Sequence, residues 1–547
     1  MCEKLIINSF LEKKYCFGRT VMIIVPHQDD EINLAGSVIV SAIKKASKVV
    51  CVFVTNGDFD YAADVRINEA KKSLNVLGVI EDNIYFLGYG DNFNNFEQSL
   101  YINKNNIVMS HAGKKETYGG KNDSEYHYRK YGKHHAYKYE NLVFDIKDII
   151  LDVLPDTIFA VDFDCLHHDH KLVSFAFEDA IGAILNRFEN NYFPLILKGF
   201  CYFTAYFNEP DFYNLNFKSV TNKIKNKKFL PLFETDNPQY RWNERIRFPV
   251  DDSCRERLLK NNVLYKAMLK HHSQICIKQA RNIINSDSVF WLRRTDSLIY
   301  IAKLEVSSGN SIHLKEFRTL NVNNILDVRN YYYSDYLWIP DTDDKEKFII
   351  CYFDVPQSIS LCLLAGNIAE ESQILLGKLE FSNGFSFTVN KLDKLGRDKR
   401  VSFPKQENIV WIKFKIITYC GTNPGLSKFE VYSNNTVNFK ILKFMICDNF
   451  VYEWYILPHI KKLKFGLYKY GVEKVVIKCV NGAVVIKDDH LFFEKLEREV
   501  VIRIEDMFDS SCYDQVIIKR ISYAEYFLFK LVQLRDYLGN WFLCKKN

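Results

Sequence analysis

The chain has 547 residues, of which 48% are hydrophobic and 26% are charged, as is usual in globular proteins. Its 73 basic and 67 acidic residues leave a net charge of +6, which excludes the strongly basic composition of a nucleic-acid-binding protein. At roughly 150 residues per domain, this length predicts three or four domains.

Cysteine usage and hydropathy predict a cytoplasmic protein. The 14 cysteines are scattered and include no Cys-X-X-Cys pair, which favours free thiols in a reducing compartment. Residues 1–19 carry charged side chains where a secretion signal needs an apolar core. No run of 18 apolar residues is present, so we expect no transmembrane segment.

Strands and helices alternate through the first 290 residues or so. Two almost continuous apolar runs, residues 21–25 and 49–54, are typical of strands buried on both faces of a parallel sheet. The alternation predicts an α/β fold with a Rossmann-like, mostly parallel sheet and helices on both of its faces. The other predicted strands are 84–87, 157–161 and 195–204, and the predicted helices are 35–46, 64–77, 140–154 and 169–188.

Two further segments complete this part of the chain. Residues 105–139 are polar, aromatic and rich in glycine, and a loop of this length is usually a lid or a substrate wall. Within it, Thr117-Tyr118-Gly119 either lines a substrate cleft or is plain loop. Apolar residues at helical spacing predict one long helix over residues 254–285.

Beyond residue 307 the hydrophobic period changes to two. Residues 410–416 alternate apolar and polar side chains, as a half-buried antiparallel strand does. Asn383-Gly384 and Asn481-Gly482 each lie between two such runs and predict β-hairpins. We therefore expect two all-β, sandwich-like domains after the α/β domain. The predicted domain boundaries are 1–305, 306–437 and 438–547.

The tail, residues 526–546, is rich in aromatic side chains and ends in two lysines. Such a segment either lies on a membrane surface as a peripheral contact or packs on the last β domain.

The chemistry-bearing motifs follow two strands of the predicted sheet. Residues 26–31, PHQDDE, come directly after the first strand, and residues 164–170, DCLHHDH, follow the strand at 157–161. Ligands of open α/β sheets bind at the carboxyl ends of the strands, where these two loops can converge. Histidine and aspartate are good zinc ligands, so the sequence predicts a metal site at this edge.

Together the two motifs resemble the PIG-L (LmbE-like) family of zinc-dependent de-N-acetylases, which act on N-acetylglucosamine conjugates. The family patterns are Pro-His-Pro-Asp-Asp-Glu and His-Pro-Asp-His, and Gln28 and His168 replace the two prolines. The resemblance covers about residues 20–185. Supporting matches in the family order are Thr55-Asn56-Gly57-Asp58, Arg66-Ile67-Asn68-Glu69-Ala70 and Leu87-Gly88-Tyr89-Gly90-Asp91.

The resemblance implies a role for each motif residue. His27, Asp30 and His170 would bind the metal, Asp29 would be the general base, and His167 would polarise or protonate the reacting amide. Zn²⁺ is the expected ion, and the same ligand set also accepts Fe²⁺, Mn²⁺ or Co²⁺.

Three further residues have expected roles around that core. The resemblance places Arg66 and Asp91 against the sugar, although Arg66 could instead pair with Glu69 one helical turn on. Asp169, beside His170, is expected to orient the ligands through hydrogen bonds. His134-His135 and His271-His272 are interpreted as surface or helix histidines.

The sequence therefore predicts a metal-dependent hydrolase that removes the N-acetyl group from an N-acetylglucosamine-type sugar in a glycoconjugate. Two alternatives stay open: an amidase acting on another N-acyl or thiol-sugar conjugate, and an inactive glycan-binding scaffold.

The first β domain resembles a discoidin-type, galactose-binding-like sandwich. The resemblance rests on Trp338-Ile339-Pro340-Asp341, the strand at 348–353 and residues 421–432. Carbohydrate is a possible partner of such a module. Trp338 is then either a sugar-stacking platform or a core residue.

Overall fold

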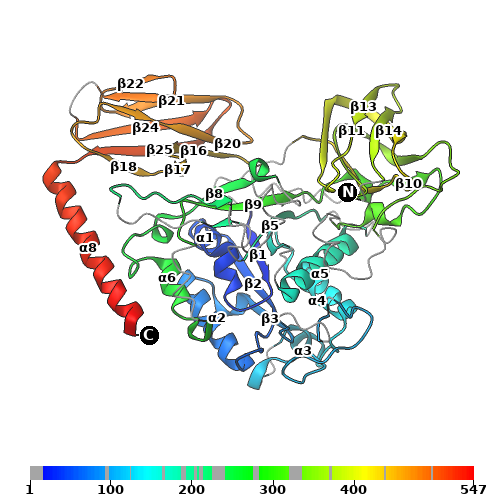
Figure 1. Cartoon of the computed structure of the whole chain (residues 1–547), viewed down its shortest axis with the longest axis horizontal. Coiled ribbons are helices and arrows are strands. Elements are labelled where there is room, and N and C mark those ends of the chain that lie inside the picture. The colour runs from blue at the N-terminus through cyan, green and yellow to red at the C-terminus, as the bar shows by residue number, and fades with distance from the viewer. Residues whose placement is uncertain are drawn as a thin grey trace.

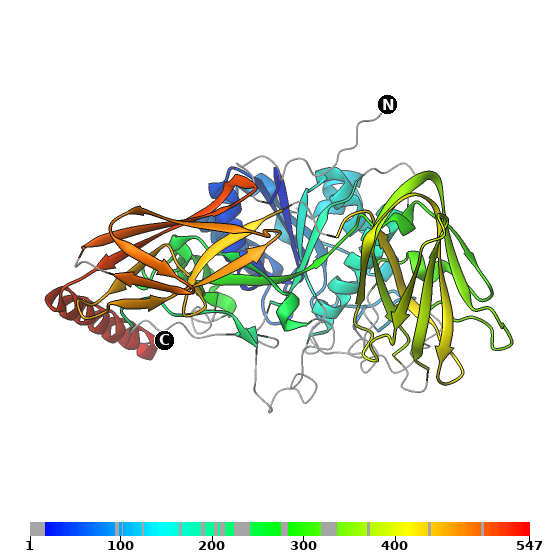
Figure 2. The same ribbon diagram turned by 90° about the horizontal axis from the view of Figure 1, so that it is seen from above.

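The computed structural model describes residues 17–92, 98–100, 102–122, 125–162, 167–186, 192–201, 206–207, 214–223, 241–274, 283–318, 336–368, 372–435, 439–493 and 497–546. Within this part of the chain an α/β unit lies between two β units (Figure 1 and Figure 2).

A seven-stranded sheet in the order β3-β2-β1-β4-β5-β9-β8 forms the centre of the α/β unit. All five predicted strands are present, although the one predicted over 195–204 ends at Gly199, and β1 to β5 are parallel. Strands β9 and β8, which were not predicted, add an antiparallel edge. The bounds are β1 Thr20–Val25, β2 Lys48–Thr55, β3 Ile84–Tyr89, β4 Thr157–Val161, β5 Leu195–Gly199, β8 Ile246–Pro249 and β9 Asp287–Arg293.

Helices cover both faces of this sheet, as predicted. Helices α1, α2 and α6 pack together on one face, and α4 and α5 pack on the other (Figure 1). The bounds are α1 Asp30–Lys44, α2 Ala63–Leu77, α3 Tyr126–Tyr131, α4 Tyr139–Val153, α5 His168–Leu185 and α6 Val263–Met268. Helix α1 begins five residues before its predicted start, and the non-helical Ala35 (φ −142°) interrupts it where that start was placed.

The prediction of one long helix over 254–285 is wrong for the residues that the structure describes there. The Asn262 side chain accepts the backbone N–H groups of Leu264 and Tyr265, so that a new helix, α6, begins at Val263. Its amide group also donates to the carbonyls of Cys254 and Glu256, which keeps the preceding segment folded as turns. Residues 275–282 lie outside the described part of the chain.

The first β unit is built on two long antiparallel strands, β11 and β14. The predicted hairpin at Asn383-Gly384 is confirmed, since it joins the paired strands β12 and β13 and Gly384 has a φ of 87°. Trp338 is fully buried and its indole N–H donates to the Ser308 carbonyl, so it is a core residue and not a sugar platform. The strands are β10 Lys303–Val306, β11 Phe348–Gly366, β12 Ile374–Phe381, β13 Ser386–Asn390, β14 Lys399–Tyr419 and β15 Leu426–Tyr432.

The second β unit contains three small sheets, in the orders β17-β16-β20, β18-β25-β24-β21 and β19-β23-β22. The hairpin predicted at Asn481-Gly482 is wrong, because β21 pairs with β24 whereas β22 pairs with β23. The Glu497 carboxylate binds the Ala483 N–H directly after the turn, where the chain passes from one sheet to another. The strands are β16 Ile441–Ile446, β17 Asn449–Phe450, β18 Glu453–Ile456, β19 Lys462–Lys464, β20 Gly466–Tyr470, β21 Val475–Asn481, β22 Val484–Lys487, β23 His490–Phe493, β24 Glu499–Asp506 and β25 Asp509–Arg520.

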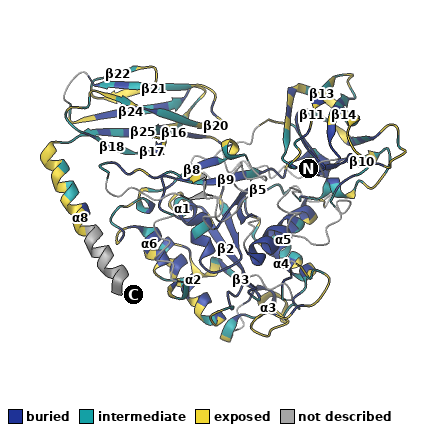
Figure 3. Cartoon of the chain, viewed as in Figure 1, coloured by how far each residue is buried: buried dark blue, intermediate teal, exposed yellow. Residues whose placement is uncertain are grey.

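The tail forms helix α8, Tyr523–Lys546, which runs away from the sheets of the last unit (Figure 1). Its described half contacts the last β unit at its start, where the Tyr523 hydroxyl lies 2.8 Å from His459 Nδ1, and Phe529 lies against Arg257 of the α/β unit. Phe527 and Leu528 are each more than 60% exposed, and Figure 3 shows most of this half of the helix in the colour of exposed residues. No helix in the described part of the chain is long and apolar enough to cross a membrane.

Candidate metal centre and active site

The two predicted motifs meet at the carboxyl ends of β1 and β4. His27, Asp30 and His170 lie together in the buried interior of this edge. One carboxylate oxygen of Asp30 is 3.1 Å from His27 Nδ1 and 3.3 Å from His170 Nε2. The structure therefore brings together the three residues that the sequence predicts as metal ligands.

The other ring nitrogen of His27 faces two more carboxylates. Its Nε2 is 3.2 Å from Asp169 and 3.5 Å from Asp91. The same Asp169 oxygen also accepts the Asn92 N–H at 2.8 Å, which fixes the carboxylate in place. A second possible ligand group, His27 with Asp91, His167 and Asp169, consequently shares His27 with the first.

The first group fits a divalent metal. Two imidazoles and one carboxylate suit zinc, and Asp169 on the second nitrogen of His27 reproduces the carboxylate–histidine–metal arrangement common around metal ligands. Asp30 Oδ1 is buried and has no hydrogen-bond partner among the described residues. Although burial would raise the pKa of Asp30, His170 and His27 hold it well below its usual value, so this carboxylate is ionised for binding a cation.

Asp29 points away from Asp30 and into a pocket. It stands just before α1 with φ 137°, its backbone N–H donates to Glu31, and its carboxylate lies 3.5 Å from Arg66 Nη2. Burial raises the pKa of Asp29 to about 6, against the lowering effect of Arg66. The alternative pairing of Arg66 with Glu69 is not observed, because Glu69 instead accepts two hydrogen bonds from Ser273.

His167 stands at the N-terminus of α5 as a neutral imidazole. Burial, together with His27 and His170, lowers its pKa to about 2. Its Nδ1 accepts the backbone N–H of Asp169 at 3.2 Å. In a neutral ring this acceptor role leaves the proton on Nε2. His167 is therefore able to donate a hydrogen bond from Nε2.

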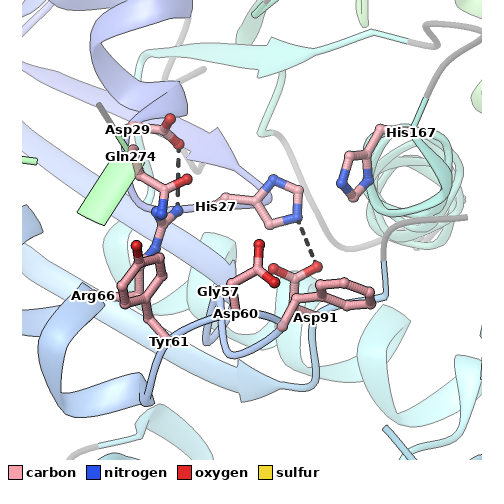
Figure 4. Close-up of a pocket in the computed structure, with 10 residues that line it drawn as sticks. His27, Asp29, Gly57, Asp60, Tyr61, Arg66, Asp91, His167 and Gln274 are labelled. Carbon is pink, nitrogen blue, oxygen red and sulfur yellow. Dashed lines mark hydrogen bonds and ion pairs between the residues drawn. The ribbon is translucent and has the colours of Figure 1, made fainter. Parts of the chain in front are cut away.

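These side chains surround a cavity of about 400 Å³. Figure 4 shows Asp29 and Arg66 along one wall, with His27, Asp91 and His167 along the other. The lining residues at positions 57–61 could have been predicted from the sequence, because they follow β2 and ligands bind at the carboxyl ends of the strands. Gln274 does not lie directly after a strand, so the same rule does not predict its place in the pocket. The lining residues are His27, Asp29, Gly57, Phe59, Asp60, Tyr61, Arg66, Asp91, His167 and Gln274.

The insertion at 105–139 contacts this wall indirectly. Tyr118 donates its hydroxyl to Asp58, and the other Asp58 oxygen accepts the Asp91 N–H at 2.7 Å. The Tyr118 carbonyl accepts a hydrogen bond from Asn56. Tyr118 thus supports the segment that carries Asp91 and is not itself among the residues that line the cavity.

One of the four histidines interpreted as surface or helix residues, His271, is buried, whereas His134 and His135 are partly exposed and His272 is exposed. His271 is 1% exposed and its Nε2 is 3.0 Å from Glu31. His135 and the buried His127 each place Nδ1 within 3.0 Å of an Asp145 oxygen. The interpretation is therefore wrong for His271. The sequence gives no signal for the His271 contact, because its partner Glu31 lies 240 positions away in the chain.

The α/β unit thus combines a mostly parallel sheet with a buried histidine–aspartate cluster at the carboxyl ends of its strands. Residues 22–181 match the PIG-L family, described as GlcNAc-PI de-N-acetylase, and form a PIG-L domain. Residues 333–432 match DUF7402, a domain family of unknown function. No curated protein matches the chain.

Similar solved structures include enzymes and sugar-binding modules. The N,N'-diacetylchitobiose deacetylase of Pyrococcus horikoshii is 16% identical, with a TM-score of 0.28, over 53% of this chain and 86% of that one. Chitosan-binding module 1 of a Paenibacillus chitosanase/glucanase is 13% identical, with a TM-score of 0.18, over 25% and 98%. A Clostridium perfringens module in complex with GalNAc-β-1,3-galactose is 10% identical, with a TM-score of 0.19, over 25% and 99%.

Proposed function

We propose that the protein is a metal-dependent N-deacetylase that removes the acetyl group from an N-acetylglucosamine-type sugar in a glycoconjugate. One observation carries the proposal. In a PIG-L domain, a buried His27–Asp30–His170 group lies beside a pocket that Asp29, Arg66 and His167 line. All the residue types that amide hydrolysis at a metal needs are present at this one place.

His27, Asp30 and His170 would hold the ion, with zinc as the expected metal. When bound, such a metal polarises an amide carbonyl and lowers the pKa of water. Asp169 holds His27 in the required orientation through its hydrogen bond to Nε2.

Asp29 accepts the proton of the attacking water. A general base works best with a pKa near the operating pH, and burial raises the pKa of Asp29 to about 6. Arg66 favours the ionised form of this base. His167 donates its Nε2 proton in a hydrogen bond to the amide oxygen, where negative charge develops during attack.

Arg66 is also proposed as a sugar contact. It is 3% exposed, it lines the pocket, and its Nε and Nη1 have no hydrogen-bond partner among the described residues. Buried donors of this kind need acceptors, which sugar hydroxyl or acyl oxygens would supply. Asp91, on the opposite wall, is the proposed acceptor for a sugar hydroxyl.

A coupled assay of acetate release tests this function. The intact protein, loaded with zinc, is expected to release acetate from at least one conjugate of N-acetylglucosamine. The Asp29→Asn variant is the matched control because it retains the proposed metal ligands. Release that is equal in both proteins would contradict the proposal.

A further inference from the structure

The base proposed above belongs to a chain of buried contacts that starts far away in the sequence. His271 lies 90 residues beyond the end of the PIG-L match at residue 181. Its Nε2 is 3.0 Å from Glu31 Oε1, and both side chains are completely buried. Glu31 Oε2 in turn accepts the backbone N–H of Asp29 at 2.8 Å.

The geometry points to His271 as a positioning residue that holds Asp29 in its working orientation through Glu31. This inference rests on the proposed role of Asp29 as the base. His271 is not among the described residues that line the pocket, and its hydrogen-bond partner is Glu31.

The backbone of Asp29 explains why such support is needed. Asp29 and Asp30 are adjacent, yet one carboxylate faces Arg66 in the pocket and the other faces His27 and His170. The chain separates them by taking a φ of 137° at Asp29. Residues other than glycine rarely adopt this conformation, and it persists only where surrounding contacts enforce it.

Glu31 enforces this conformation because its carboxylate accepts the backbone N–H of Asp29. It could turn away from the Asp29 N–H if it had no other partner. His271 holds Oε1 directly, and Ser73 Oγ lies 3.4 Å from the same oxygen. The second oxygen, Oε2, is therefore directed at the Asp29 amide.

The segment that carries His271 is itself fixed to the α/β unit. The backbone N–H and hydroxyl of Ser273 donate to the two carboxylate oxygens of Glu69 on α2, at 3.0 and 2.6 Å. Gln274, the next residue, lines the pocket. The contact of Ser273 with α2 therefore positions both neighbours: His271 lies against Glu31, and Gln274 forms part of the pocket wall.

The test compares three variants of the full chain. His271→Ala removes the contact, His271→Gln keeps an amide donor at about the position of Nε2, and His272→Ala changes the exposed neighbouring histidine as a control. We expect His271→Ala to lower kcat about 10- to 100-fold, as losses of hydrogen-bonded supporting groups do. Its KM and bound metal should be unchanged. His271→Gln should recover most of kcat, and His272→Ala should match the wild type.

A double variant and an activity-independent measurement distinguish positioning from general stability. If His271 acts through the base, His271→Ala should cost little more in an Asp29→Asn background. Hydrogen–deuterium exchange of a peptide covering residues 26–33 should be faster in His271→Ala and normal in His271→Gln and His272→Ala.

Normal exchange in that peptide, or a kcat of His271→Ala within twofold of the wild type, would overturn the inference. If the wild type releases no acetate, the proposed function fails, and the exchange measurement still decides whether His271 holds the Asp29 backbone. If His271→Ala does not fold, His271→Gln and Ser273→Ala are compared with His272→Ala by the same two measurements. Wild-type values for Ser273→Ala, the variant that loosens the segment, would then contradict the inference.

Discussion

Asp29 and Asp30 are neighbours in the chain, but their carboxylates lie in different environments. That of Asp30 is enclosed by His27 and His170, whereas that of Asp29 faces Arg66 at the pocket. Burial raises the pKa of Asp29 to about 6, while the two histidines hold that of Asp30 well below its usual value. The two residues therefore have the properties of a base and of a ligand, respectively.

Replacing Asp29 by asparagine should separate catalysis from metal binding. The new side chain would keep the shape of the carboxylate, but its amide group could not accept a proton. We expect kcat to fall by about 10²- to 10⁴-fold while the metal content stays near that of the wild type. Steady-state kinetics and elemental analysis of the same sample measure both quantities. Loss of metal in this variant would instead make Asp29 a ligand.

The pH dependence of kcat/KM should report the pKa of Asp29. The base form is the ionised one, so activity should be constant above the pKa, which is about 6. It should fall about tenfold for each pH unit below that value. Arg66 lowers this pKa, so Arg66→Ala should move the acidic limb to higher pH.

The control for that shift is Lys71→Ala on the same helix, because Lys71 pairs with the exposed Glu81 away from the pocket. Its pH profile should coincide with that of the wild type. An acidic limb that stays in place in Arg66→Ala would mean that another group titrates there.

Asp91 distinguishes the two ligand groups that share His27. As a sugar contact it should affect KM, since a hydrogen bond lost at a sugar hydroxyl costs about 1–3 kcal/mol. Asp91→Asn is then expected to raise KM and keep the metal. If the ion instead lies between His27, Asp91, His167 and Asp169, the metal content of Asp91→Asn would fall. Asp30→Asn would then keep its metal.

Arg247 of β8 pairs with Asp287 of β9 inside the α/β unit and also with Asp448 of the last β unit. Arg247 and Asp287 are almost completely buried and 2.6 Å apart, and Arg247 also donates to the Asp448 carbonyl. Asp287→Ala would remove one of the two carboxylates that pair with the buried Arg247, and we expect this to lower the free energy of unfolding by about 1–3 kcal/mol. Denaturant titration checks this value. Lys464→Ala, from an exposed pair with Asp489, should change it by less than about 1 kcal/mol.

The parts of the fold that depend on local sequence could be predicted. β1 is buried on both faces, and its apolar run and the PHQDDE turn that follows lie next to each other in the chain. The convergence of the two motifs followed from the rule that parallel strands present their carboxyl ends at one edge, whereas the choice of His27, Asp30 and His170 as ligands came from the resemblance to the PIG-L family.

The remaining features depend on contacts between distant residues. The turn at Asn481-Gly482 has the sequence of a hairpin, but the partners of its flanking strands are β24 and β23. His271 and Glu31 are 240 positions apart, and neither residue alone indicates that the other is its partner.

Metal removal and replacement in the intact wild-type protein shows whether acetate release depends on a bound metal ion. Acetate release from a panel of N-acetylglucosamine conjugates is measured after chelation and again during titration with zinc. We expect that chelation abolishes acetate release, that about one equivalent of zinc restores it, and that zinc does not restore it in Asp30→Asn. Acetate release that survives complete removal of metal, or no release from any conjugate by the fully loaded protein, would contradict the proposed metal-dependent deacetylase function.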